Sequence, residues 1–183
     1  MLLNNCLDFT QYSQLDVAIV SDTHGDIVTD VTDLVKQCDI VIHAGDIGNM
    51  AVLEQLQPKL KHVLAVAGNN DKLYLWQVKD WDIVRKLPRK LDISLSGGVI
   101  SVEHGDAHDV NKPSHKSLRD AHQFSRAVIY GHTHHQVIDE VEPDLWVVNP
   151  GASGTTRTHG GASCLKLSIS ENDWKIEAYR FNE

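Results

Sequence analysis

Three short and mostly apolar runs, each followed by glycine and polar residues, dominate the first seventy positions of the chain. The runs cover 17–20, 39–44 and 62–67 and are rich in Val, Ile and Ala. Apolar segments of this length are typical of strands buried on both faces. Apolar residues at helical spacing predict a helix over 27–37, and a second helix is predicted near 49–57, before Pro58. Strands that alternate with helices indicate a mainly parallel sheet with helices on its faces.

The second half of the chain changes to an alternating pattern. Residues 91–96 and 99–104 alternate apolar and polar positions around Gly97-Gly98, which predicts a β-hairpin. A polar loop over 106–116, a short helix over 117–124 and a strand over 126–130 follow. Further short strands are predicted at 136–141, 145–149, 162–170 and 173–181. These strands favour a second, more antiparallel sheet that packs on the first. We expect a single domain over 1–183, with 1–15 as an N-terminal extension or edge strand.

Composition and charge narrow the class of protein. A chain of 183 residues with 42% hydrophobic and 23% charged residues is typical of one globular domain. The net charge of -8 argues against a general nucleic-acid binder, because affinity for phosphate backbones requires clustered Lys and Arg. Cys6, Cys38 and Cys164 are scattered without a paired spacing, as a reducing compartment permits. We find no signal peptide or membrane-spanning run and therefore expect a cytoplasmic protein.

Polar side chains follow five of the predicted strands. Because strand ends in an α/β sheet meet at one edge, these side chains are expected to converge there. Each signal alone has an ordinary explanation, since Gly-Asp and Gly-Asn also form simple turns, but coincidence at five strand ends favours a site. Carboxylates, an amide and imidazoles are suitable ligands for two divalent cations that share one bridging carboxylate, for which we choose Asp46. The candidate ligands are Asp22, His24, Asp46, Asn69, His104, His132 and His134.

The order Asp-x-His, Gly-Asp, Gly-Asn, His-Gly and Gly-His-Thr-His resembles the calcineurin-like metallophosphoesterase superfamily, and the short chain resembles its small prokaryotic phosphodiesterase subfamily. The resemblance covers about 16–180. It implies a four-layer α/β/β/α sandwich of two mixed β-sheets flanked by helices, with two divalent metal ions at the strand ends. Mn is the leading candidate, with Fe, Ni, Co and Zn as alternatives. By motif matching, one ion takes Asp22, His24, Asp46 and His134, and the other takes Asp46, Asn69, His104 and His132.

The function that follows is a dinuclear metal-dependent phosphoesterase, and a phosphodiesterase in particular. Two cations lower the pKa of a bridging water, so that hydroxide can attack phosphorus in line with the leaving oxygen. A phosphomonoesterase or nucleotidase is the alternative within enzymes, and a non-catalytic scaffold like the related retromer subunit is the alternative outside them. The expected partner is a small phosphate ester, including a small nucleotide, with no membrane; a homo-oligomer stays open.

Two positions bear on substrate choice. Many superfamily members carry His after Gly-Asn, which resembles a general acid for the leaving group, whereas this chain carries Asn70. Because an amide donates a hydrogen bond but no proton, we expect slow turnover of alkyl esters. Relatives also follow an Asn-Pro-Gly-Ser turn with a basic residue. Here Asn149-Pro-Gly-Ala-Ser is followed by Arg157, either as a phosphate contact or after a turn with no ligand role.

Other histidines and two tryptophans leave alternatives open. His108 and His115 lie in the predicted polar loop and can either supply an imidazole to the cleft or be solvated. His43 lies within a predicted strand, so a core role is favoured over metal binding. Trp76 and Trp81 form a lid, an oligomer surface or part of the core.

Overall fold

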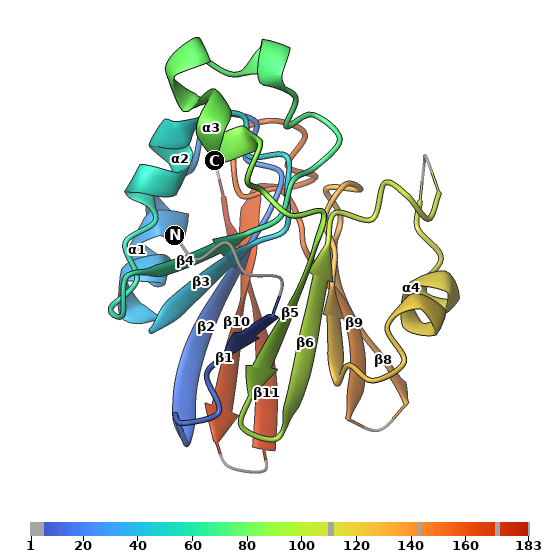
Figure 1. Ribbon diagram of the computed structural model, residues 1–183. Helices are drawn as coiled ribbons and strands as arrows, with labels where there is room; N and C mark the ends of the chain where they lie inside the picture. The colour runs from blue at the N-terminus through green and yellow to red at the C-terminus, as the bar shows by residue number, and fades with distance from the viewer. Residues whose placement is uncertain (1–5, 110–111, 143, 171–172, 183) are drawn as a thin grey trace.

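Two mixed β-sheets stacked face to face form the centre of the computed structural model (Figure 1), which describes residues 6–109, 112–142, 144–170 and 173–182. The first sheet has the strand order β11-β10-β2-β3-β4, and the second has the order β1-β5-β6-β7-β9-β8. The strands of the first sheet are β2 (Gln14–Val20), β3 (Ile40–His43), β4 (His62–Ala65), β10 (Ala162–Ser170) and β11 (Asp173–Phe181). Those of the second are β1 (Cys6–Asp8), β5 (Lys90–Leu95), β6 (Gly98–Glu103), β7 (Ala127–Ile129), β8 (Gln136–Glu142) and β9 (Leu145–Pro150).

Strand direction follows the connections between elements. Strands β2, β3 and β4 run parallel, joined by helical crossovers, whereas β10 is antiparallel to both β2 and β11. In the second sheet, β5 and β6 form the expected hairpin, with Leu95 opposite Gly98 and a positive φ of 84° at Gly97. Strand β1 adds to the edge of this sheet, parallel to β5. The loops after β2, β3, β4, β6 and β7 consequently emerge at one end of the sandwich.

Helices cover both outer faces, which gives the expected four-layer α/β/β/α sandwich. Helices α1 (Thr29–Gln37), α2 (Met50–Gln55) and α3 (Trp81–Val84) lie on the side of the first sheet, with the short 3₁₀ helices η1 (Leu73–Leu75) and η2 (Val78–Asp80). Helix α4 (His115–Ala121) covers the second sheet. Among the described residues, no helix has the length and apolar character needed to cross a membrane.

Alternation along the buried strands divides the core into layers. Val17 and Ile19 of β2 face the second sheet, whereas Ala18 and Val20 face the helices. On the other side, Leu118 of α4 packs in a small cluster with residues of β7 and β9. The near-continuous apolar runs seen in the sequence therefore reflect burial on both faces of the sheet.

Helix boundaries depart from the predicted ranges where specific hydrogen bonds hold the chain. Helix α1 begins at Thr29 rather than residue 27, because the Val28 amide donates to the Ser153 carbonyl outside the helix. Helix α4 begins at His115 rather than residue 117, since Ser114 caps it by accepting from the Ser117 amide. Trp76 is only 5% exposed, so the part of that segment around Trp76 belongs to the core.

Candidate metal centre

The seven residues expected as ligands lie in the loops that follow β2, β3, β4, β6 and β7. Most of them have a left-handed backbone, which is uncommon for residues other than glycine and costs about 1–3 kcal/mol each. Such strain persists where surrounding structure holds it, and it concentrates at functional sites. The strained candidates are Asp22 (φ 52°), His24 (φ 47°), Asp46 (φ 55°), His132 (φ 68°) and His134 (φ 59°).

Two buried carboxylates and three imidazoles meet at the centre of the site. His134 Nε2 lies 3.4 Å from Asp22 Oδ1, and His104 Nε2 lies 3.4 Å from Asp46 Oδ2. His24 Nε2 is 3.8 Å from Asp46 Oδ2, and His104 Nε2 is 4.0 Å from Asp22 Oδ1. Two sets of three have ligand atoms within 4.8 Å of one another, Asp22 with His24 and His134, and Asp22 with Asp46 and His104.

The remaining two candidates, Asn69 and His132, join this cluster at its edge. His132 Nδ1 lies 3.1 Å from Asn69 Oδ1, and the His132 amide donates to Asp22 Oδ1 at 3.2 Å. The loop after β7 is thereby tied to the loops after β2 and β4. All seven side chains predicted from the sequence are brought together.

Backbone carbonyls fix which ring nitrogen points into the cluster. His104 Nδ1 lies 2.8 Å from the Ala44 carbonyl, and His134 Nδ1 lies 3.2 Å from the Thr156 carbonyl. Because a carbonyl only accepts, each Nδ1 carries hydrogen, and Nε2 is the ring nitrogen that faces the carboxylates. A ring oriented in this way through its other nitrogen is typical of a histidine that binds metal.

Two acceptor nitrogens face each other beside Asp22. Arg157 Nη2 donates to His24 Nε2 at 3.1 Å, so that nitrogen is an acceptor. His24 Nε2 also lies 3.1 Å from His134 Nε2, which is an acceptor in the neutral ring. Two lone pairs at this distance repel unless a cation lies between or beside them.

Unsatisfied buried atoms point the same way. Asp22 Oδ2 and His104 Nε2 are both buried and have no hydrogen-bond partner among the residues that the structure describes. A buried polar atom without a partner costs about 1–3 kcal/mol. Divalent cations bound by O and N ligands would satisfy both atoms and the facing lone pairs, so the residues present fit divalent metal ions.

Burial and charged neighbours shift the pKa values of the clustered carboxylates and imidazoles. Burial raises the pKa of Asp22 to about 7, although the nearby His104 opposes this. Burial would lower the pKa of His104, but the carboxylates of Asp46 and Asp22 outweigh it and raise the pKa to about 9. Burial, Arg157 and His24 lower the pKa of His134 to about 4. Before metal binds, a protonated His104 therefore offsets part of the carboxylate charge.

Asn70 and Arg157, the two expected substrate-binding residues, both touch this cluster. The Asn70 amide donates to Asp46 Oδ1 at 2.8 Å, and Asn70 Nδ2 donates to Asp46 Oδ2 at 2.7 Å. The side chain of Asn70 thus holds a carboxylate. Arg157 is exposed and contacts His24, so its guanidinium borders the cluster on the solvent side.

Asp71 is a residue that sequence reasoning missed. Its buried carboxylate accepts from the Ile47, Gly48 and Gly68 amides and from Trp76 Nε1, at distances of 2.9 to 3.3 Å. These bonds connect the loop that carries Asp46 to the turn that carries Asn69. The available signal was an acidic residue directly after Gly-Asn-Asn at the end of a buried strand.

Asn149 has a structural role in the loop that carries His132 and His134. Its Nδ2 donates to the Gly131 carbonyl at 2.6 Å and to Thr133 Oγ1 at 3.1 Å, and its Oδ1 accepts from the Gly151 amide at 2.8 Å. These contacts show that the Asn-Pro-Gly turn holds the histidine loop.

The other histidines have partners outside the cluster. His43 lies in β3 and accepts from the Gly45 amide at 3.2 Å, with its Nε2 2.9 Å from Thr23 Oγ1; burial lowers its pKa to about 3. Both ring nitrogens of His108 are engaged, by Glu103 and Ser117. Both ring nitrogens of His115 are likewise engaged, by Asp139 and Tyr130. An acid role for His108 or His115 would require these bonds to break.

Comparisons with known proteins agree with the motifs. The family model of the calcineurin-like phosphoesterase superfamily domain matches residues 15–172. The chain is 30% identical over 147 residues to phosphodiesterase MJ0936 of Methanocaldococcus jannaschii, a match that covers 75% of this chain and 83% of that protein.

Solved structures agree on the fold. A structure described as a novel archaeal phosphodiesterase aligns with a TM-score of 0.64 at 22% identity, over 90% of this chain and 100% of that one. Vps29 from Entamoeba histolytica, complexed with Zn²⁺, aligns with a TM-score of 0.66 at 15% identity, over 92% and 99%. The family model spans most of the chain and includes every motif of the cluster, so this protein belongs to the calcineurin-like phosphoesterase superfamily and is a phosphoesterase.

Proposed function

We propose that this protein is a phosphodiesterase that works with two divalent cations, Mn²⁺ foremost, held by the seven clustered residues. The observation that carries the proposal is the convergence of two carboxylates and several imidazoles, in which buried Asp22 Oδ2 and His104 Nε2 have no hydrogen-bond partner among the described residues. The similarity to a phosphodiesterase at 30% identity favours diesters as the substrate class.

The proposed division of ligands follows the loops. Asp22, His24 and His134 would hold one ion and Asn69, His104 and His132 the other, with Asp46 shared. Asp22 belongs both to the set with His24 and His134 and to the set with Asp46 and His104, so it is a second candidate for the shared carboxylate. When bound, two cations neutralise charge on the phosphate and make water acidic enough to supply hydroxide near neutral pH.

The protein's own side chains orient the substrate around this centre. Arg157 is placed to donate to a phosphate oxygen, because its guanidinium already reaches His24 at the solvent edge of the site. Asn70 holds both oxygens of Asp46, so its proposed contribution is to fix that carboxylate and, through any donor left over, to bind the leaving oxygen. We assign no proton donor for the leaving group.

Two alternatives differ in what they predict. A phosphomonoesterase would use the same centre on substrates with a terminal phosphate. A non-catalytic scaffold on this fold is less favoured, because all seven positions here carry side chains able to bind metal.

Hydrolysis of bis-p-nitrophenyl phosphate and p-nitrophenyl phosphate by chelator-stripped protein, before and after Mn²⁺ is restored, tests the proposal. Asp46→Asn serves as the loss-of-site variant. Asp16→Asn is the matched control, since Asp16 lies at the other end of β2 and accepts from Ser168 Oγ. We expect the wild type and Asp16→Asn to hydrolyse the diester only when Mn²⁺ is present, and Asp46→Asn to be inactive. Turnover of the monoester alone would favour the phosphatase, and binding of metal without any turnover would favour the scaffold.

A further inference from the structure

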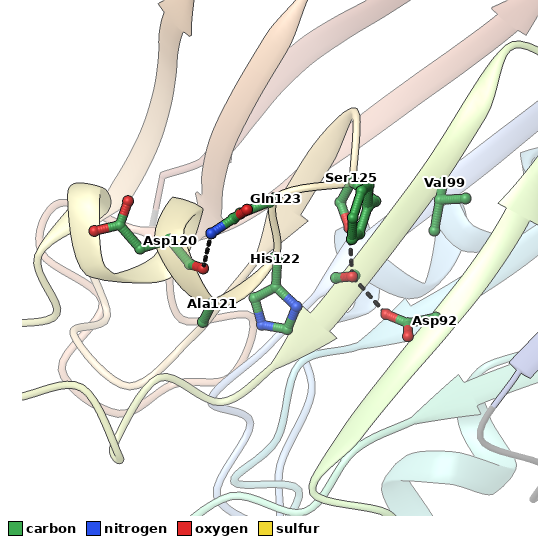
Figure 2. A pocket seen from close by; sticks show the side chains of 9 residues that line it. Asp92, Val99, Asp120, Ala121, His122, Gln123 and Ser125 are labelled. Carbon is green, nitrogen blue, oxygen red and sulfur yellow. Dashed lines mark hydrogen bonds between the residues drawn. The ribbon is translucent and has the colours of Figure 1, made fainter.

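Two surface hollows near the second sheet differ in charge. The hollow in Figure 2 lies beside α4 and is lined by two carboxylates, Asp92 and Asp120. Its hydroxyls are already engaged, because Ser101 Oγ donates to Asp92 at 2.5 Å and lies 2.6 Å from Ser125 Oγ. An anionic ligand would be repelled there.

The other hollow has a volume of about 430 Å³ and no carboxylate in its lining. It is lined by Lys112, Tyr130, Thr133, His135 and Val137. An ammonium group and an imidazole border a space large enough for a phosphate group and part of what carries it, while the hydroxyls of Tyr130 and Thr133 are already bonded to His115 and Asn149. This combination of donors suits an anion.

Basic side chains continue from this hollow toward the metal centre, and we call Lys112, His135, His159, Arg180 and Arg157 the basic strip. The rings of His135 and His159 stack with centroids 3.9 Å apart. Burial, followed by His159, Lys112 and Arg180, lowers the pKa of His135, so these three groups lie near its ring. Arg157 forms the other end of the strip, against His24.

Among the described residues, the cations of the basic strip form no side-chain ion pair, although the protein carries a net charge of -8, and Asp109 Oδ1 accepts from the Lys112 backbone amide at 3.3 Å. Within the described part of the chain, no carboxylate lies within ion-pair distance of Lys112, Arg157 or Arg180. Arg180 instead donates to backbone carbonyls and to Gln136 Oε1. Asp139, which is close to Tyr130, is bound to His115 at 2.5 Å.

The hollow and the metal centre share one loop. His132 and His134 point into the centre, while Thr133 and His135 of the same loop line the hollow. The segment 156–159 runs alongside, with the Thr156 carbonyl at His134 and the ring of His159 on His135. A ligand that extends from the metal centre past Arg157 therefore meets the basic strip next.

We propose that the substrate carries a second phosphate group besides the scissile one, and that the second phosphate binds in the hollow lined by Lys112, Thr133 and His135. This inference rests on the proposed function, because it extends the substrate of the same site. The substrate class is a phosphodiester with a terminal phosphate on the part retained after cleavage. Charge-assisted hydrogen bonds from the basic strip then select such substrates over plain diesters.

Two synthetic diesters with the same leaving group test this. Thymidine 5′-(p-nitrophenyl phosphate) is compared with its 3′-phosphorylated form, and the ratio of their kcat/KM values is measured with the Mn²⁺-loaded protein. We expect a ratio of about ten or more, which is one good charge-assisted contact. The ratio should fall to about one in the double variant Lys112→Gln/His135→Gln. Lys116→Gln, a change of an exposed α4 lysine paired with Asp120, should leave it at the wild-type value.

A binding measurement separates this inference from the proposed function. Thymidine 3′,5′-bisphosphate titrated into metal-free protein should shift the amide resonances of Thr133, His135 and Val137, and the double variant should bind it at least tenfold more weakly. Inorganic phosphate is then added as a competitor. If the hollow binds phosphate independently of the substrate, inorganic phosphate displaces the bisphosphate while the kcat/KM ratio stays at one, and that result overturns the proposal. A ratio of one with bis-p-nitrophenyl phosphate still hydrolysed also refutes this inference but keeps the phosphodiesterase. Failure to hydrolyse any diester, with the bisphosphate shifts intact, refutes the phosphodiesterase and keeps the phosphate site.

Discussion

Replacing Asp71 with asparagine should weaken metal binding although Asp71 is not among the ligands. Its carboxylate receives four donors, from the Ile47, Gly48 and Gly68 amides and from Trp76 Nε1. In Asp71→Asn, one acceptor oxygen becomes an NH₂ group. We expect the remaining oxygen to take the Oδ1 position and to keep the donors there. The new NH₂ group then faces the Gly68 amide, and both groups are hydrogen-bond donors.

The structure sets the size of the effect. The Gly68 amide bond of 2.9 Å is buried, and leaving such a donor unpaired costs about 1–3 kcal/mol. Gly68 packs directly against Asp46, because a Cβ there would lie 2.1 Å from Asp46 Oδ1. Displacement of the turn therefore separates Asn69 from Asp46. Loss of a residue that orients metal ligands typically lowers affinity about 10–100-fold, and we expect that range for the ion that Asn69 and Asp46 share.

Calorimetric titration of stripped protein with Mn²⁺ measures this directly. Asp71→Asn should retain one site near wild-type affinity and weaken the other. Asp16→Asn is the control, because it removes a carboxylate bonded to Ser168 and Lys166 far from the site and should reduce stability without changing either affinity. If Asp71→Asn is less stable but binds both ions as tightly as the wild type, Asp71 does not position ligands and the reasoning is wrong.

Three further predictions concern protonation and leaving groups. The pKa of His104 is raised to about 9, so metal-free protein should lose up to about 3 kcal/mol of stability as pH rises from 6.5 through 9, and thermal melts should show no such loss once Mn²⁺ replaces the proton. Burial raises the pKa of Cys38 to about 11 and that of Cys164 to about 12, so a Cys6→Ser variant should resist thiol reagents at pH 7.5 until it unfolds; rapid labelling of the folded protein would contradict their burial. Asn70→His should raise the rate on alkyl diesters relative to p-nitrophenyl diesters at least tenfold, since a proton donor helps poor leaving groups most; an unchanged ratio would show that no acid can act from this position.

Much of the fold could be read from the sequence because its signals are local. The Gly97-Gly98 hairpin and the parallel strands were visible in apolar runs and turn residues, and both are present. The ends of helices were less predictable. The start of α1 depends on a bond from Val28 to Ser153, and no pattern near residue 28 reveals a partner 125 positions away.

The candidate ligands were also predictable, because each follows a recognisable strand. The residues that hold these ligands in place were not predictable. Asp71 reads as an ordinary polar residue until folding brings the Ile47 and Gly48 amides to it. The same holds for Asn149, whose amide donates to the Gly131 carbonyl just beyond the neighbouring strand β7. Supporting residues act through backbone groups that carry no sequence signature, so only the fold identifies them.

The central claim is that two divalent ions together make this site hydrolyse diesters. The most direct test adds Mn²⁺ in known equivalents to chelator-stripped protein at micromolar concentration and records the initial rate on bis-p-nitrophenyl phosphate at each step. We expect a negligible rate without metal and a rise that levels off at two equivalents. Full activity in stripped protein, or a plateau at one equivalent, would contradict it.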